Sequence, residues 1–165
     1  MSVTRNIAES YVRPRRVMRR ILAAGPREDR AIATLAAGCL VLFVASWGRL
    51  AREAAETGQE LVPLMSNTLY ATLFVVPLLM YGIAALSHLI AKPFGAKGGW
   101  FAARMALFWT LLATSPLLIL WGLTSGLIGP GPQEQITGLI WLVAFVVLWT
   151  LNLREAERIP LEEAA

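Results

Sequence analysis

Ionisable and metal-binding side chains are scarce in this chain. Charged residues make up 16% of its 165 positions against 56% hydrophobic residues, and there is one cysteine and one histidine. Cys39 therefore has no partner for an internal disulfide. His88 has neither a cysteine pair nor a carboxylate at helical spacing beside it, so we expect no metal site, no cofactor and no catalytic residue.

Charges are also missing from the middle of the apolar stretches, where no Asp, Glu or Lys occurs. An ionisable side chain inside a bilayer is costly, and where one occurs it usually serves ion or proton transport. Arg104 lies one turn from the start of its stretch, so its guanidinium can reach the membrane surface. This scarcity argues against a proton-coupled or ion-coupled transporter.

Four apolar stretches dominate the chain and predict its fold. About 20 helical residues cross a hydrocarbon core about 30 Å thick. We therefore expect an all-α integral membrane protein, a four-transmembrane-helix bundle with an N-terminal amphipathic interfacial helix. The spans are expected at about 31–50, 68–91, 100–128 and 135–153, the third being one tilted helix kinked near Pro116.

The basic residues fall mostly on one side of these spans. Only Arg49 and Arg52 lie on the other side, so the positive-inside rule places both termini in the cytoplasm. The majority side holds the eight arginines before the first span, Lys92, Lys97, Arg104, Arg154 and Arg158. Because the chain is rich in arginine and poor in lysine, we expect a bacterium with a GC-rich genome and a location in its inner membrane.

This orientation divides the chain into three parts: a basic cytoplasmic segment at 1–27, a membrane domain at 28–153 and a short cytoplasmic tail at 154–165. The basic segment reads as an amphipathic helix from Pro14 onward, with the proline in its first turn. Its apolar side carries Val17, Met18, Ile21 and Leu22, and its basic side carries Arg13, Arg16, Arg19 and Arg20.

Two readings of these arginines remain open and are compatible. They bind anionic lipid headgroups, at about 1 kcal/mol for each basic residue near the surface, or they only set the topology. Nucleic acid is not expected as a partner, because the segment offers no aromatic platform for stacking bases.

Proline and glycine mark four further positions within the spans. Pro77 and Pro116 each remove a backbone hydrogen bond, which predicts either a hinge or a fixed kink that improves packing. Gly122 and Gly126 form a small-xxx-small pair, which would let their helix approach another closely.

The region from Leu86 to Leu120 resembles the core of bacterial Yip-domain proteins, the Ypt-interacting protein family. The likeness rests on His88-Leu89, Lys92, Gly95, Lys97-Gly98 and the mid-span Pro116, and covers about 31–153. The resemblance implies a helical membrane domain. Members usually have five spans, whereas four are expected here, and eukaryotic members act as adaptors for small GTPases in vesicle traffic and shape membranes.

From these patterns we expect a non-enzymatic membrane protein of Yip-like type. It would organise membrane or act as an accessory or assembly partner of a membrane complex, with anionic lipids, a membrane protein or a second copy of itself as partners. One alternative is an oligomeric transporter or channel for a neutral or amphiphilic molecule, lined by Thr110, Thr114, Ser115 and Asn152. A third hypothesis is a lipid-modifying enzyme that uses His88.

Overall fold

The computed structural model describes residues 3–159, and within this range every regular element is a helix. The elements are α1 (Val3–Val12), α2 (Pro14–Leu22), α3 (Glu28–Thr57), α4 (Leu61–Tyr70), the π-helix η1 (Ala71–Val75), α5 (Val76–Ala91), the 3₁₀-helix η2 (Lys92–Phe94), α6 (Trp100–Ala113), α7 (Ser115–Leu127) and α8 (Pro132–Ala156). The all-helical fold class is therefore confirmed.

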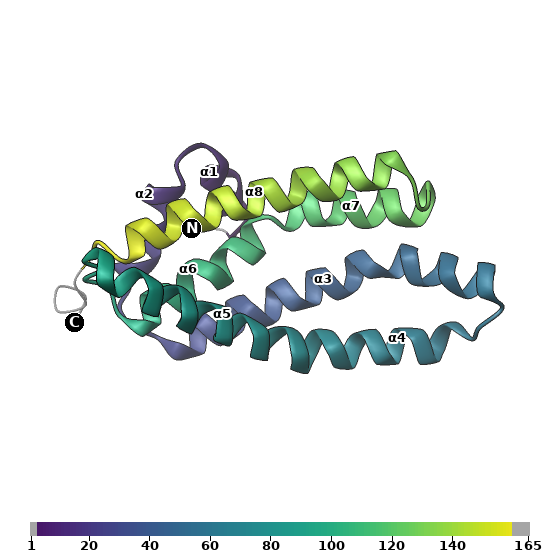
Figure 1. The fold of residues 1–165 in the computed structure, drawn as a ribbon, viewed down its shortest axis with the longest axis horizontal. Helices are drawn as coiled ribbons and strands as arrows, with labels where there is room; N and C mark the ends of the chain where they lie inside the picture. Colours follow the sequence, from purple (N-terminus) through teal and green to yellow (C-terminus); the bar gives the residue numbers. More distant parts are fainter. Residues whose placement is uncertain (1–2, 160–165) are drawn as a thin grey trace.

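The helices form two long hairpins around a central helix (Figure 1). One hairpin consists of α3 followed by α4, η1 and α5, and the other consists of α7 followed by α8. The tight turns of both hairpins lie at one end of the molecule, the turn end. The opposite end, called here the terminal end, holds α2, the connection from α5 to α6 and the last turn of α8.

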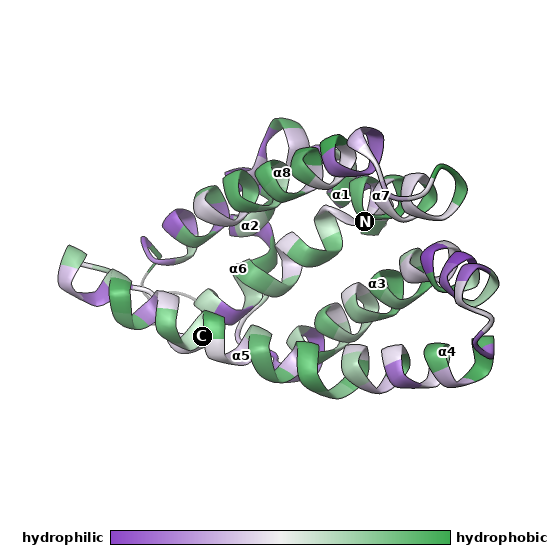
Figure 2. Cartoon of the chain, turned by 45° about the vertical axis from the view of Figure 1, so that its right-hand side comes forward, coloured by the Kyte–Doolittle hydropathy of each residue, from purple (hydrophilic) through white to green (hydrophobic). Residues whose placement is uncertain are grey.

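Three helices pass the length and hydropathy requirements for a membrane span, and a fourth span arises if the bent pair of α6 and α7 is one crossing. The three are Glu28–Thr57, Leu61–Phe94 and Pro132–Ala156, and they bury only 11–22% of their apolar windows inside the chain. Figure 2 shows their hydrophobic residues along most of their length and hydrophilic residues gathered at the ends. This pattern makes the protein a multi-pass membrane protein.

The first two spans are longer than their apolar runs indicated. α3 begins with Glu28 and Asp29 in its first turn, where the helix dipole stabilises acidic side chains. It continues to Thr57 and is ended by Gly58, which has a positive φ of 69°. The second span begins at Leu61 and not at about residue 68. The second span therefore includes polar residues that the hydropathy pattern assigned to the loop before it.

Pro77 follows a local widening of the second span. The π-helix η1 ends just before it, and the amide of Val76 bonds to the carbonyl of Ala71, five residues back. A proline ring collides with the carbonyl four residues earlier in a regular α-helix, and a wide turn moves that carbonyl aside. The span therefore passes the proline without a break between Leu61 and Phe94.

The region of the expected third span forms two helices, which corrects the expectation of one continuous kinked helix. α6 ends at Ala113, α7 begins at Ser115, and the two axes differ by 47°. Pro116 lies in the first turn of α7, where its missing amide costs no helical hydrogen bond. The hydroxyl of Thr114 donates to the carbonyl of Thr110, 3.0 Å away, so the end of α6 is partly capped inside the protein.

α3 and α7 approach each other through glycine. A Cβ on Gly126 would lie 2.5 Å from the Cα of Gly48, and one on Gly122 would lie 2.1 Å from the carbonyl oxygen of Ala45. Arg52 closes the turn end of this contact, since its guanidinium donates to the carbonyls of Gly126 at 3.0 Å and Leu127 at 2.9 Å. These bonds satisfy carbonyls that the C-terminus of α7 leaves without helical partners.

We predict that Gly126→Ala destabilises the protein by about 1–3 kcal/mol, because the added methyl group collides with backbone and forces α3 and α7 apart. Gly82→Ala is the matched control, since a Cβ there meets no atom within 4 Å. The control should be neutral or more stable by up to about 1 kcal/mol. Unfolding midpoints in SDS and mild-detergent mixed micelles measure both, and equal midpoints would contradict the close contact.

Candidate functional site at the terminal end

α2 is attached to the bundle through its apolar side. Val17 and Met18 are fully buried and Ile21 and Leu22 nearly so, where α2 packs against α8 and α6. Pro14 is at the start of α2, as its sequence position suggested. The expected interfacial helix is not confirmed, because the side that would enter the lipid is covered by protein.

Two of the predicted arginines pair with carboxylates. Arg19 bonds to Glu155 of α8, which is only 3% exposed, although the Arg19 side chain itself is mostly exposed. The guanidinium of Arg20 donates hydrogen bonds to both carboxylate oxygens of Glu9, at 3.0 and 3.1 Å, and thereby holds α1 on α2. The bond from Arg20 holds the pKa of the Glu9 carboxyl below its ordinary value, so this tie is present at neutral pH and is lost as the pH falls through that lowered pKa.

Four arginines line a hollow between α2 and α8. It has a volume of about 460 Å³, and Leu151 of α8 lies beside its basic residues. The residues that line it are Val12, Arg13, Pro14, Arg15, Arg16, Arg19 and Leu151. Arg13, Arg15 and Arg16 are exposed, and Arg16 has only a long contact of 3.9 Å with Glu9. Sequence reasoning identified three of these four arginines, but it missed Arg15 and the contribution of α8.

Buried polar contacts tie α1 and α8 to α6. The indole of Trp109 donates to the hydroxyl of Ser10 over 3.0 Å, and the amide nitrogen of Asn152 donates to the hydroxyl of Thr110 over 3.0 Å. Thr110, Thr114 and Asn152 have no exposed surface. These residues were candidates to line a transport path, and their packing between helices gives that hypothesis no support.

His88 also joins two helices at the terminal end. Its Nδ1 lies 2.8 Å from Oε1 of Glu157, and both side chains are more than nine-tenths buried. The imidazole packs on Trp100 at 4.6 Å between centroids, and Lys92 lies over the same indole at 5.2 Å. Sequence reasoning found no carboxylate for His88, because Glu157 is 69 residues away and no local spacing relates the two.

The backbone of Glu157 continues this junction. Its carbonyl accepts hydrogen bonds from the amides of Lys97 at 2.8 Å and Gly98 at 3.1 Å. A Cβ on Gly98 would lie 2.5 Å from the carbonyl of Ala156, so only glycine fits this close approach. The loop between α5 and α6 is thereby fixed to the end of α8.

The chemistry available to His88 is limited by these contacts. The neighbouring Ser87 hydroxyl donates to the carbonyl of Ala84 at 2.9 Å, away from the imidazole. Among residues 3–159 no three His, Cys, Asp or Glu side chains cluster as metal ligands would. In this arrangement His88 acts as a buried hydrogen-bonding partner between α5 and α8.

The fold, the apolar spans and the basic terminal end define a polytopic helical membrane protein. The Yip1 domain family matches residues 8–165, which is nearly the whole chain, and the chain belongs to that family. The match begins within α1, so it extends well beyond the 31–153 over which the resemblance was seen in the sequence. Neither a curated protein nor a solved structure matches the chain.

We predict that His88→Ala lowers the free energy of unfolding by about 1–3 kcal/mol, because it leaves the buried carboxylate of Glu157 without its partner. Ser87→Ala is the neighbouring control and should change the free energy far less, since its hydroxyl bonds only within its own helix. Thermal unfolding in mild detergent, followed by circular dichroism, compares the two. An unchanged midpoint for His88→Ala would show that the pair does not hold α5 to α8.

Proposed function

We propose that this protein is a non-enzymatic Yip-type membrane protein that organises anionic lipid at its terminal end and serves as an accessory partner in the membrane. The observation that carries the proposal is the hollow lined by Arg13, Arg15, Arg16 and Arg19. Members of this family are generally non-enzymatic membrane proteins, which agrees with the absence of catalytic motifs from the sequence.

The anchoring of α2 supports lipid binding by charge. Because its apolar side is held by α6 and α8, its arginines are presented on a fixed surface and not on a freely inserting helix. Guanidinium groups match phosphate oxygens geometrically, and the negative surface of a cytoplasmic leaflet attracts basic segments. Leu151 beside the arginines offers an apolar surface for the part of the lipid next to its phosphate.

The distribution of charge supports an orientation with this end on the cytoplasmic side of the membrane, which we propose to be a bacterial inner membrane. Lys92 and Lys97 belong to the connection from α5 to α6, and Arg104 lies in the following turns of α6, at the same end as the arginines of α2. The positive-inside rule favours such a basic end on the cytoplasmic side.

The outward faces of the spans support a partner within the membrane. Large apolar side chains of α5 and α8 are more than half exposed, among them Leu78 and Leu139. Lipid covers such faces in a monomer, and another membrane protein or a second copy covers them in a complex. An accessory role is therefore compatible with the lipid role at the terminal end.

We predict that the double variant Arg13→Gln/Arg15→Gln binds phosphatidylglycerol about 30-fold more weakly. Two basic residues at about 1 kcal/mol each give this change, and both side chains line the hollow. The full-length protein in mild detergent is titrated with phosphatidylglycerol and with phosphatidylcholine, and bound lipid is counted by native mass spectrometry.

The matched control is Arg27→Gln/Arg30→Gln, which removes the same charge from the same end but outside the hollow. It should retain most of the phosphatidylglycerol binding. Equal loss in both double variants would mean that net charge alone attracts the lipid. No loss in the first would refute the lipid-binding role of α2.

A further inference from the structure

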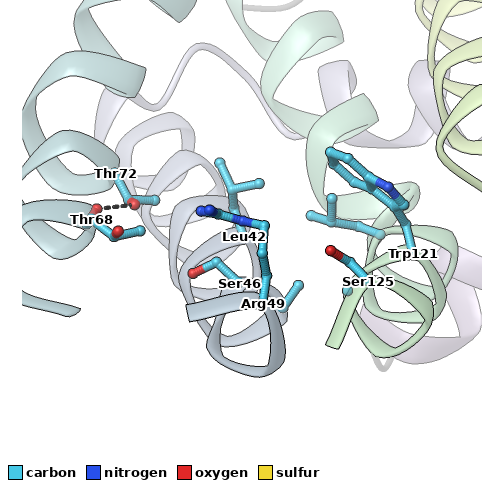
Figure 3. A pocket seen from close by; sticks show the side chains of 10 residues that line it. Leu42, Ser46, Arg49, Thr68, Thr72, Trp121 and Ser125 are labelled. Atoms are coloured by element: carbon cyan, nitrogen blue, oxygen red, sulfur yellow. Dashed lines mark hydrogen bonds between the residues drawn. The ribbon is translucent and has the colours of Figure 1, made fainter. Parts of the chain in front are cut away.

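A second hollow lies at the other end of the molecule, between the two hairpins. It encloses about 200 Å³, with α3 as its floor and with α4, η1 and α7 as its sides (Figure 3). The residues that line it are Leu42, Ala45, Ser46, Arg49, Thr68, Thr72, Leu118, Trp121, Gly122 and Ser125. Nothing in the proposed function uses this pocket, which is here called the hairpin pocket.

The hairpin pocket is graded from polar to apolar along α3. Arg49 lies two turns closer to the turn end than Leu42, which corresponds to about 10 Å of helix. Leu42, Leu118 and Trp121 also line the pocket, and each lies at least one helical turn farther from the turn end than the polar lining residue of its own helix, Arg49 or Ser125. An amphiphile would therefore place its polar group near Arg49 and its chain toward Leu42.

The polar mouth continues into an adjoining hollow of about 210 Å³. The two hollows share Arg49 and Ser125, and the second adds Glu134 of α8. Glu134 is half-buried and accepts a hydrogen bond from the Ser125 hydroxyl at 3.2 Å. Within residues 3–159 it has no basic partner in an ion pair.

The two arginines at this mouth differ in how many hydrogen bonds they already make. Arg52 is held by two carbonyls of α7 and by Glu56. Arg49 is half-exposed and has one bond, 3.0 Å long, to Glu53 on its own helix. Exposed pairs of this kind contribute little stability, so the guanidinium can bind another anion at low cost. The mouth thus presents an available cation and an available carboxylate.

A zwitterionic headgroup complements this arrangement. The guanidinium of Arg49 can donate to a phosphate, and the carboxylate of Glu134 can accept from an ammonium group. A primary ammonium donates hydrogen bonds, whereas the quaternary ammonium of choline has none to donate, and a glycerol headgroup carries no positive charge. Ethanolamine supplies both required groups without the additional carboxylate of a serine headgroup, which Glu53 and Glu56 at the same mouth would repel.

We propose that the hairpin pocket binds one molecule of phosphatidylethanolamine, with its phosphate at Arg49, its ammonium at Glu134 and the start of one acyl chain along Leu42 and Trp121. The pocket lies at the turn end, so this lipid belongs to the leaflet opposite the arginine hollow of α2. The π-helix η1 contributes Thr72 to the wall, and π-turns within α-helices occur often at functional sites.

The test titrates the delipidated full-length protein with phosphatidylethanolamine, phosphatidylcholine and phosphatidylglycerol that carry identical acyl chains. Native mass spectrometry measures each dissociation constant. The background carries Arg13→Gln/Arg15→Gln, so that binding at the terminal end is strongly reduced. We expect phosphatidylethanolamine to bind about tenfold more tightly than either other lipid, which is about 1.4 kcal/mol.

Three variants locate the lipid. Arg49→Gln should weaken phosphatidylethanolamine about tenfold, and Glu134→Gln should remove the preference over phosphatidylcholine. Ser46→Leu should reduce binding of all three lipids, because it fills the pocket. The matched controls are Arg27→Gln, Glu60→Gln and the exposed Ala36→Leu, none of which lines the pocket.

Equal affinity for the three lipids, or preference for phosphatidylglycerol, would overturn the proposal. It would also be overturned if Arg49→Gln and Glu134→Gln behaved like their controls, or if the pocket were covered by a second copy of the chain. Arg49 and Glu134 are surface changes that leave the packing intact, so the test stands even if Ser46→Leu fails to fold. The arginine hollow of α2 is tested by separate variants, so the proposal for one site can be refuted without refuting the proposal for the other.

Discussion

Twelve of the fourteen residues of α6 are buried, and five other helices, α1, α2, α3, α5 and α8, pack against it. This helix is only about 21 Å long, too short to cross the hydrocarbon core alone. Pro116 prevents it from continuing straight, and α7 leaves it at an angle of 47°. The two hairpins are therefore held together at the level of α6 and diverge beyond it (Figure 1).

Both proposed lipid sites follow from this arrangement. At the terminal end, α2 rests on α6 and α8 and turns its arginines outward. At the turn end, α3 and α7 stay together through glycine while α4 contributes the third side of the hairpin pocket. In the proposed account the basic surface faces one leaflet and the recess for a zwitterionic headgroup faces the other.

Local features of the sequence predicted much of this fold. The apolar runs predicted an all-helical, multi-pass membrane protein, Pro14 marked the start of α2, and Pro116 marked the change of direction between α6 and α7. Each of these features can be recognised from residues that are close together in the sequence. The start of the second span at Leu61 was missed, because a helix can extend through polar residues outside the hydrocarbon core.

Contacts between distant segments were not predictable in the same way. The pairing of His88 with Glu157 spans 69 residues, and that of Arg19 with Glu155 spans 136. The expected interfacial helix was not confirmed, because burial against lipid and burial against protein require the same sequence pattern. The charges that form the mouth of the hairpin pocket come from α3 and α8, so no spacing in the sequence relates them.

The most direct test of this account asks what covers the apolar side of α2. Spin labels are placed at Arg15→Cys or Met18→Cys in a Cys39→Ala background, and the protein is reconstituted in bilayers containing anionic lipid. Electron paramagnetic resonance then measures collisions with oxygen, which concentrates in lipid, and with a water-soluble nickel complex. The account predicts a label at position 15 accessible to nickel, and an immobilised label at position 18 accessible to neither. A mobile label at position 18 that collides readily with oxygen would contradict it, because α2 would then lie in the lipid and not on the bundle.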